Sequence, residues 1–426
     1  MRGNSPTSKA IKKFILHLHP HKIDRRAIVF TRTFGLGGIA ALLFFILFIT
    51  GMMLRFVYVP SAGQAYDSIL VIKNEIIFGN LLRNLHYWSA MLLVIVAFLH
   101  LVRVFYSQSL FYERRKNWIY GLLLMFLVVS SNFTGYLLPW DQLSYWAVTI
   151  MTNLLSYIPL VGNGLADMVR DGTTVNERTL LRFYHFHTGL LPLIMVILMT
   201  IHFWLVRKAG GVALPETDEK TSKVAVHPHL IYKEAVVALC LILALLLFSM
   251  FVDAPLMDKA KPAVSPNPSK APWYFMGFQE LLMHVHPLFS SFLIPLSVIS
   301  FLAAIPFFNY SHLKPGRWFY SKNGKTITIA SGIFAFAYTF LFIILSDKVF
   351  DFNHWFAAWP IINSTGIIPT LLYWGPVFGF MYFLNKKLKA LRIEKVIGWV
   401  TVIFMAYITM MLIGSFLRGE GMQLIF

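Results

Sequence analysis

Four histidines within two long apolar runs are the residues of this chain best placed to do chemistry. His86 and His100 lie in one run, and His187 and His202 lie in the other. If each run is helical, a step of 14 residues falls about 40° short of four turns, and a step of 15 passes them by about 60°. Each pair therefore points roughly to one side of its helix, with about 21 Å between its members. Two such helices facing each other would offer two imidazoles at each of two depths, the ligand set for two six-coordinate haems.

The alternative interpretation is four unrelated core histidines, each hydrogen-bonded to a carbonyl or hydroxyl oxygen. Matched steps on two helices of similar length favour shared ligation. His185 does not compete, because it lies two residues from His187 and points away from that face. The other histidines fall in segments between the apolar runs.

Two pairs of glycines, on the first and third apolar runs, are each separated by 14 residues, as His86 and His100 are. They are Gly37 and Gly51 on the first run, and Gly121 and Gly135 on the third. A glycine costs about 1 kcal/mol relative to alanine in a helix, but it lets a bulky planar group approach the backbone. We expect these four glycines to provide clearance for haem. The alternative is close packing of helices through small residues, which Gly35 and Gly38 fit equally well.

Cationic side chains near the histidines could pair with haem propionates. Arg83 and Arg103 lie about one helical turn outside the first histidine pair, at opposite ends of its run, and Arg207 and Lys208 follow the second pair. We expect Arg83, Arg103 and Arg207 to contact propionates. The alternative is that each long side chain only extends towards the membrane surface.

The composition indicates a polytopic membrane protein. Of the 426 residues, 57% are hydrophobic and 13% are charged, about half the charged fraction of soluble proteins. The net charge of +18 comes from basic residues in short connections between apolar blocks, which the positive-inside rule explains better than binding to nucleic acid does. The single cysteine, Cys240, excludes an iron–sulfur cluster or a CxxCH haem attachment within this chain.

Nine membrane spans are expected, and the alternation of basic connections places the N-terminus in the cytoplasm and the C-terminus outside a cell inner membrane. The expected ranges are 34–56, 79–104, 118–139, 181–206, 233–253, 289–309, 327–347, 367–385 and 396–417. The predicted fold class is all-α: a four-helix di-haem bundle followed by about five further spans.

Four parts are expected along the chain. They are a basic cytoplasmic arm, the di-haem bundle, a cytoplasmic linker and a C-terminal membrane domain, at 1–33, 34–210, 211–232 and 233–426. The connection 254–288 begins rich in proline and lysine and ends in an aromatic segment. Connections of this length are usually functional or disordered.

Four segments around these residues resemble the signature blocks of the cytochrome b family of quinol:cytochrome c or quinol:plastocyanin oxidoreductases. They read GNLLRNLHYWSA, TGYLLPWDQLSYWAV, TLLRFYHFHTGLLPL and MTIHFWLVRKAGG. The second histidine step resembles that of the short, plastid-type cytochrome b6, and the resemblance covers about residues 30–300. It implies that His86 and His187 hold an outer, low-potential haem, and that His100 and His202 hold an inner, high-potential one.

The resemblance also implies a quinol-oxidising pocket near the outer surface. Its expected residues are Pro139, Trp140, Asp141, Pro272, Trp273 and Tyr274. The family's Pro-Glu-Trp-Tyr segment reads Ala-Pro-Trp-Tyr here, so Pro272 stands where the proton-accepting glutamate would be. We expect Glu280, eight residues further on, to supply that acid. The alternative is that Glu280 only sits in a solvated loop.

Two further departures from the family pattern concern the first and the last spans. Plastid-type relatives attach an extra haem through a cysteine, and the matching position here is Gly35, far in the chain from Cys240. We therefore predict two non-covalent b haems and no covalent haem. The last two or three spans exceed the short family form, and the sequence assigns them no role.

The resemblance predicts the cytochrome b subunit of a quinol-oxidising electron-transfer complex. One electron from quinol goes to a Rieske-type or other iron–sulfur protein, and the other crosses the membrane through two haems to a second quinone. A c-type cytochrome subunit, lipid and a homodimeric assembly are the other implied partners. One alternative is the di-haem membrane anchor of a hydrogenase or formate dehydrogenase, which would not need the two outer segments. Another is a transporter with structural histidines.

Overall fold

The structure, a computed structural model, describes residues 22–217 and 222–425. Within these residues, nine helical segments are long and apolar enough to cross a membrane. In chain order they are α3 (Leu36–Leu54), α5 (Gly79–Tyr106), η2–α6 (Tyr112–Arg114, Arg115–Tyr136), α9–η4–α10 (Glu177–His185, Phe186–Leu190, Leu191–Lys208), α11 (Val226–Phe251), η5–α13–η6 (Phe289–Leu293, Ile294–Ala304, Ile305–Phe307), α14 (Lys322–Lys348), η7–α16 (Asn363–Ile367, Ile368–Lys387) and α17 (Arg392–Phe416). The prediction of an all-helical, polytopic membrane protein is confirmed.

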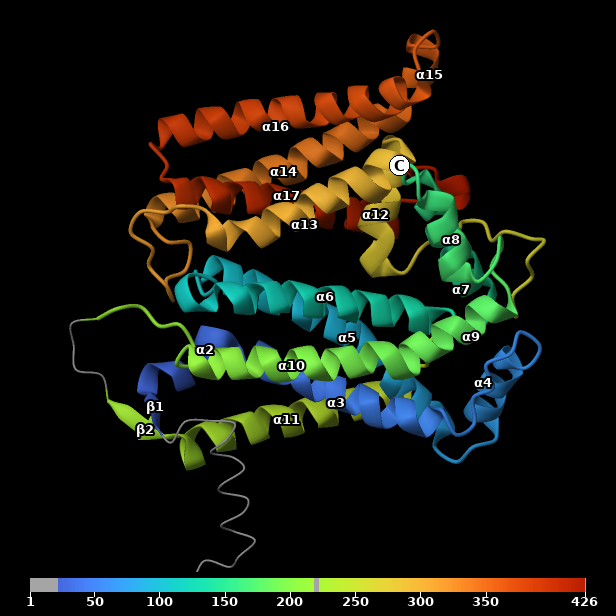
Figure 1. Ribbon diagram of the computed structural model, residues 1–426, viewed down its shortest axis with the longest axis horizontal. Helices are drawn as coiled ribbons and strands as arrows, with labels where there is room; N and C mark the ends of the chain where they lie inside the picture. Colours follow the sequence, from blue (N-terminus) through green and yellow to red (C-terminus); the bar gives the residue numbers. More distant parts are fainter. Residues whose placement is uncertain (1–21, 218–221, 426) are drawn as a thin grey trace, which may run out of the picture.

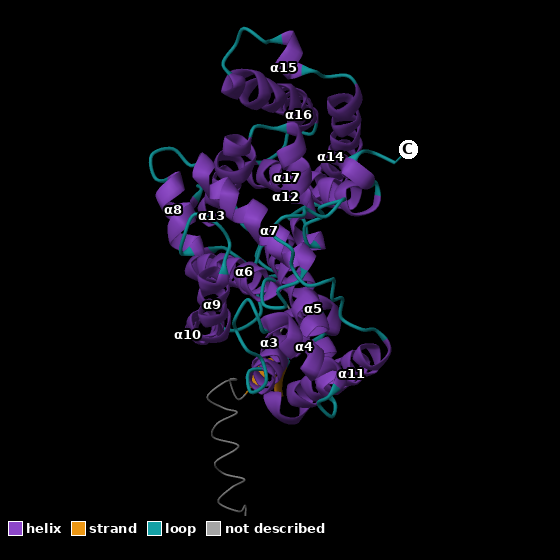
Figure 2. Cartoon of the chain, turned by 90° about the vertical axis from the view of Figure 1, so that its right-hand side faces the viewer, coloured by secondary structure: helices purple, strands orange, loops and turns teal. Residues whose placement is uncertain are grey.

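The spans form two groups that lie side by side (Figure 1). The first contains α3, α5, α6 and α10, with α11 packed on α3 and α5, and the second contains α13, α14, α16 and α17. Short helices gather at one end of the molecule: α4 (Ala65–Asn74), α7 (Gln142–Asn153), α8 (Gly162–Arg170), α12 (Trp273–His284) and α15 (Phe352–Trp355). Figure 2 looks onto that end and shows α12 beside α17. All the predicted pocket segments therefore lie at one end of the spans.

Two short strands lie at the opposite end (Figure 1). Strand β1 (Lys22–Asp24) pairs antiparallel with β2 (Lys223–Ala225), with Ile23 opposite Val224. The second strand leads directly into α11, which begins at Val226. The end of the N-terminal arm is thus hydrogen-bonded to the connection between α10 and α11.

Three of the spans contain a wide π turn near their beginning. These turns are η4 (Phe186–Leu190), η5 (Phe289–Leu293) and η7 (Asn363–Ile367). A proline follows each turn at the second residue of the next helix: Pro192, Pro295 and Pro369. Proline lacks an N–H and collides with the carbonyl four residues earlier, so the preceding turn widens instead of closing as an α-turn.

Helix α17 is the central element of the second group. It packs along α14 and α12, and half of its most apolar stretch is buried, compared with a third for α14. Ala335, Val377 and Val402 bring α14, α16 and α17 together in a fully buried core. At the strand-bearing end, Trp118 of α6 packs with Ile397 of α17 and so joins the two groups.

Candidate functional site

The two histidine pairs face each other across the first group of spans. His86 and His100 lie on α5, His187 lies in the wide turn η4, and His202 lies on α10. The ring centres of His86 and His187 are 6.2 Å apart, and those of His100 and His202 are 6.5 Å apart. Two metal–imidazole bonds of about 2 Å, plus about 1.1 Å from each nitrogen to its ring centre, give about 6.2 Å. Both pairs are spaced so that the two imidazoles could bind one metal ion between them.

Each pair borders an apolar cavity. The cavity at His86 and His187 is lined by residues of α3, α5, α6 and α10, and so is the cavity at His100 and His202; both are partly open to the surroundings. Four side chains line both cavities, namely Phe44, Leu93, Val128 and Met195. The residues present therefore fit two flat cofactors, one in each cavity, held between facing imidazoles.

The four predicted glycines lie on α3 and α6, and each faces one of the histidine rings. A Cβ atom would lie within 2.5 Å of the ring Cε1 at Gly135, 3.1 Å at Gly51, 3.3 Å at Gly37 and 3.8 Å at Gly121. The facing rings are, in the same order, His187, His86, His100 and His202. The glycines thus make room for the imidazoles themselves, and clearance for a macrocycle stays a prediction.

Hydrogen bonds fix which nitrogen of two histidines is free to bind a metal. The Nδ1 of His187 lies 2.9 Å from the carbonyl oxygen of Ser131, which can only accept, so Nδ1 carries the proton. The Nδ1 of His86 lies 2.9 Å from the hydroxyl of Thr50, whose own proton goes to the Ile46 carbonyl at 2.8 Å. In both rings Nε2 therefore keeps its lone pair, which is the usual arrangement in metal-bound histidine.

The wide turn η4 explains how steps of 14 and 15 residues can serve equivalent pairs. A π turn takes one residue more than an α-turn, so the step from His187 to His202 spans almost the same rotation and rise as a shorter α-helical step. The helical period of the histidines alone does not predict this turn. Pro192 was the signal that could have predicted it.

Two of the predicted propionate arginines are already engaged with the backbone. Arg83 donates from its two terminal nitrogens to the carbonyls of Ala254 and Pro255, at 2.9 and 2.7 Å. Arg103 donates from Nε to the carbonyl of Arg32 at 2.9 Å. Pairing of either guanidinium with a propionate stays a prediction.

A cation that was not predicted lines the cavity of His86 and His187, whereas Arg83 and Arg103 line neither cavity. Arg55 follows α3 directly, four residues after Gly51, and its Nε donates to the Tyr184 hydroxyl at 3.0 Å. Arg55 was not among the predicted cations, although its position one turn after Gly51 was a usable signal. Arg207, the remaining predicted cation, lies in the last turn of α10.

The segment after α6 is hydrogen-bonded to the connection after α11. Asp141 caps α7: its Oδ1 accepts from the backbone N–H of Ser144 at 2.9 Å, and its Oδ2 accepts from Met257 at 3.1 Å. The carbonyl of Trp140 accepts from Ala260 at 3.0 Å. Both residues are buried, and their hydrogen bonds connect the segment after α6 to the connection after α11.

Helix α12 begins with the predicted aromatic pair. Pro272 precedes the helix, and the Nε1 of Trp273 donates to the sulfur of Met91 on α5 at 3.4 Å. Tyr274 is buried, and its hydroxyl oxygen has no hydrogen-bond partner among the described residues. A buried hydroxyl of this kind usually meets a water or a ligand.

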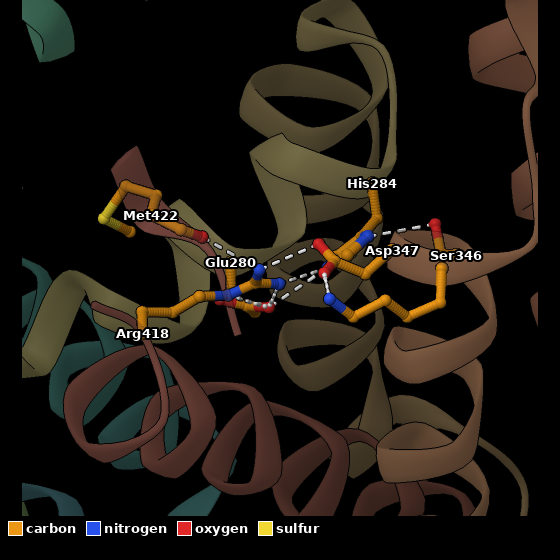
Figure 3. Close-up of polar contacts among 7 residues, drawn as sticks. Glu280, His284, Ser346, Asp347, Arg418 and Met422 are labelled. Atoms are coloured by element: carbon orange, nitrogen blue, oxygen red, sulfur yellow. Dashed lines mark hydrogen bonds and ion pairs between the residues drawn. The ribbon is translucent and has the colours of Figure 1, made fainter. Parts of the chain in front are cut away.

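Glu280 lies on α12 and is completely buried, so the solvated-loop alternative is wrong. Its carboxylate contacts Arg418, which follows α17, and the Nε2 of His284, which is 3.0 Å from Oε1 (Figure 3). Burial alone would raise the pKa of the Glu280 carboxyl, but hydrogen bonds from His284 and Arg418 outweigh burial and hold that pKa below its usual value.

The part of the chain that carries the four histidines is similar to known proteins. A family model described as cytochrome b/b6/petB matches residues 25–210. The cytochromes b6 of Synechococcus sp. (strain JA-3-3Ab) and Mastigocladus laminosus are each 42% identical over 175 residues, which is 41% of this chain and 81% of each relative. The chain belongs to the cytochrome b/b6 family. The resemblance found in the sequence is confirmed.

Structural likeness extends over nearly all of this cytochrome b. A chain from a hyperthermophilic respiratory Complex III aligns with a TM-score of 0.69 at 24% identity, covering 93% of this chain and 98% of that chain. At this identity the likeness shows the fold, the second group of spans included. Family membership supports, at a coarse level, a cytochrome b subunit of a quinol-oxidising membrane complex.

Proposed function

We propose that this cytochrome b holds two b haems, one in each cavity. His86 and His187 would hold one haem at the end that carries the short helices, and His100 and His202 would hold the other at the strand-bearing end. The observation that carries this proposal is the separation of the ring centres, 6.2 and 6.5 Å, beside two apolar cavities. When bound, haem with two imidazole ligands supplies one-electron transfer without an open iron position.

The chain's own residues orient the ligands and exclude water. Ser131 and Thr50 direct the lone pairs of His187 and His86 towards the shared space. Phe44 and Met195, among the four side chains that line both cavities, keep the space between them apolar. Gly35 stands where plastid-type relatives carry the cysteine for a covalent haem, so we propose non-covalent haems only.

We further propose that quinol is oxidised beside α12 and the segment after α6. Trp140 and Tyr274 are buried there, and the free hydroxyl of Tyr274 supports a polar ligand. Glu280 was expected to supply the proton-accepting chemistry that Pro272 cannot, but its buried carboxylate is paired with Arg418, so we assign it to the support of α12 and leave the proton acceptor unassigned. One electron passes to a partner iron–sulfur protein, and the other crosses to a second quinone at the strand-bearing end.

The proposed setting is a homodimeric complex in the cell inner membrane that also contains a c-type cytochrome. The N-terminus lies in the cytoplasm and the C-terminus lies outside, because basic residues concentrate in the connections at the strand-bearing end. The short helices α7, α8 and α12 then face outwards, towards the electron acceptor.

A haem assay of the purified complex tests this proposal. Pyridine haemochrome spectra should give two b haems for each copy of this chain, all extractable with acidic acetone. Quinol should reduce them, and reduction should stop when the iron–sulfur partner is removed. A preparation that holds no haem in this chain, or that never oxidises quinol, would contradict the proposal.

A further inference from the structure

Helix α17 holds the first half of α12 through direct backbone contact. The Tyr407 hydroxyl donates to the carbonyl of Tyr274 at 2.5 Å. A Cβ at Gly277 would lie 2.8 Å from the Tyr407 carbonyl oxygen, and a Cβ at Gly414 would lie 3.2 Å from the Met276 carbonyl oxygen. Glycines on both helices therefore bring the two backbones together beside the pocket aromatics.

An ion pair holds the other end of α12 (Figure 3). Arg418 donates from Nε to the two carboxylate oxygens of Glu280 at 3.2 and 3.1 Å, and from Nη1 to Asp347 of α14 at 2.8 Å. The side chains of Arg418 and Glu280 are both 0% exposed. The guanidinium therefore joins α12 and α14 to the end of α17 at one buried point.

The last turn of α17 and the segment after it also contact the loop that leads into α12. Lys270 donates from Nζ to the carbonyl of Ser415 at 3.2 Å, and the backbone N–H of Gly421 donates to the Asn267 side chain at 2.6 Å. Contacts from residues 407–421 thus follow the loop and α12 from one end to the other.

The electrostatics make the pair of Arg418 and Glu280 difficult to separate. Burial would lower the pKa of Arg418, but hydrogen bonds and charges from Glu280 and Asp347 outweigh burial and raise that pKa, which keeps the guanidinium charged. Removing one member of a buried pair leaves the other charge without compensation, which is strongly unfavourable. The pair therefore defines one position of α12 relative to α17.

We propose that Arg418 is a positioning residue of the outer quinol pocket. It acts through Glu280, together with Tyr407 at the other end of α12, and thereby sets the position of Trp273 and Tyr274. The inference rests on the proposed function, and it gives the last span a role: α17 is the support on which one wall of the pocket is built.

The test uses the full complex with a substitution in this chain. Arg418→Met should leave the spectra of both haems unchanged and raise KM for quinol about tenfold or more, because a small displacement of substrate-contacting groups is costly. Arg418→Lys keeps the charge but loses the two-pronged contact, so it should give an intermediate KM. A role in folding alone would lower the yield of complex and leave KM unchanged.

Two further variants keep the test decisive if Arg418→Met does not assemble. Tyr407→Phe removes only the hydrogen bond to the Tyr274 carbonyl and should raise KM by about fivefold or less. Arg392→Met is the matched control, because Arg392 is exposed at the start of α17 and donates to the Asn309 carbonyl. Its KM should equal that of the wild type.

The outcomes separate this inference from the proposed function. If the wild-type complex does not oxidise quinol, the proposed function fails. If it does, and both Arg418→Lys and Tyr407→Phe keep the wild-type KM, the positioning role is wrong. A graded rise in KM from Tyr407→Phe through Arg418→Lys, with both haems retained, supports it.

Discussion

The two groups of spans use their interiors in opposite ways. The first group leaves two apolar cavities with imidazoles facing across them, at ring separations of 6.2 and 6.5 Å. The second group closes its interior: Ala335, Val377, Met381 and Val402 are fully buried against one another, and its buried charges pair among themselves. Cavities lined by facing imidazoles indicate that the first group binds a cofactor. The buried ion pair of Arg418 and Glu280 indicates that α12 is held in one position against α17.

Loss of a ligand in the first group should have the largest effect. His187→Ala removes one of two imidazoles at its cavity, so the haem shared with His86 should be lost completely while the other haem stays. Low-temperature redox spectra measure this as the disappearance of one b-haem band. His354→Ala, which changes an exposed histidine near the second group, should keep both bands. If His187→Ala keeps both b-haem bands, His187 does not hold a haem.

Alanine at the clearance glycines should give a graded effect. In Gly135→Ala the added Cβ would lie 2.5 Å from the His187 ring, so the ring or α6 must shift, and we expect loss or strong perturbation of that haem. In Gly121→Ala the Cβ would lie 3.8 Å from His202, an ordinary contact, so that haem should be nearly unchanged. Midpoint potentials and haem content of the two variants measure the difference. Equal effects would show that ring contact is not the reason for these glycines.

Removing a hydrogen bond to a ligand should have a smaller effect. Thr50→Val deletes the acceptor for the Nδ1 proton of His86 and should weaken haem binding about 10- to 100-fold, as outer hydrogen bonds to metal ligands typically do. Thr200→Val is the control, because the Thr200 hydroxyl also donates to a carbonyl four residues earlier but lies exposed. Haem retention during detergent dilution measures both. Equal retention would remove Thr50 from the site.

Lowering the pH should weaken the ion pair of Glu280 and Arg418. The resulting change in stability should be the smallest of the four predicted effects. The pKa of Glu280 is depressed in the folded protein, so its contribution to stability is complete above the unfolded pKa of about 4.3 and is lost as pH falls through the lower folded value. The melting temperature of the wild type should exceed that of Glu280→Gln by a few degrees at neutral pH.

That gap in melting temperature should narrow between pH 5 and pH 3. Glu75→Gln, at an exposed position after α4, should keep a constant difference from the wild type over the same range. A gap in melting temperature that stays constant down to pH 3 would contradict the lowered pKa of Glu280 in the folded protein.

The spans and the pairing of the histidines could be predicted because both depend on local rules. The length of an apolar run decides whether a helix can cross a membrane, and the helical period alone decides that His86 and His100 share a side. The four glycines followed from the same period. Their contact with the imidazoles required the packing of α3 and α6 against α5 and α10.

The contacts around Glu280 and Asp141 could not be predicted, because they join distant parts of the chain. Arg418 lies 138 residues from Glu280, and no period connects them. Asp141 carries a recognisable capping signal for α7, but its second contact, to Met257, depends on how the connection after α11 folds back. Such contacts depend on tertiary packing, and the residues next to them in the sequence show no pattern that would predict them.

The π turn η4 contains one residue more than an α-turn would. The number of residues between His187 and His202 therefore does not by itself decide whether the two side chains lie on the same face. A segment that widens by one residue where a proline follows can gain or lose that residue and still deliver both side chains to the same face. Deleting Leu190 together with Pro192→Ala should therefore yield an ordinary helix that still brings the two imidazoles to their partners.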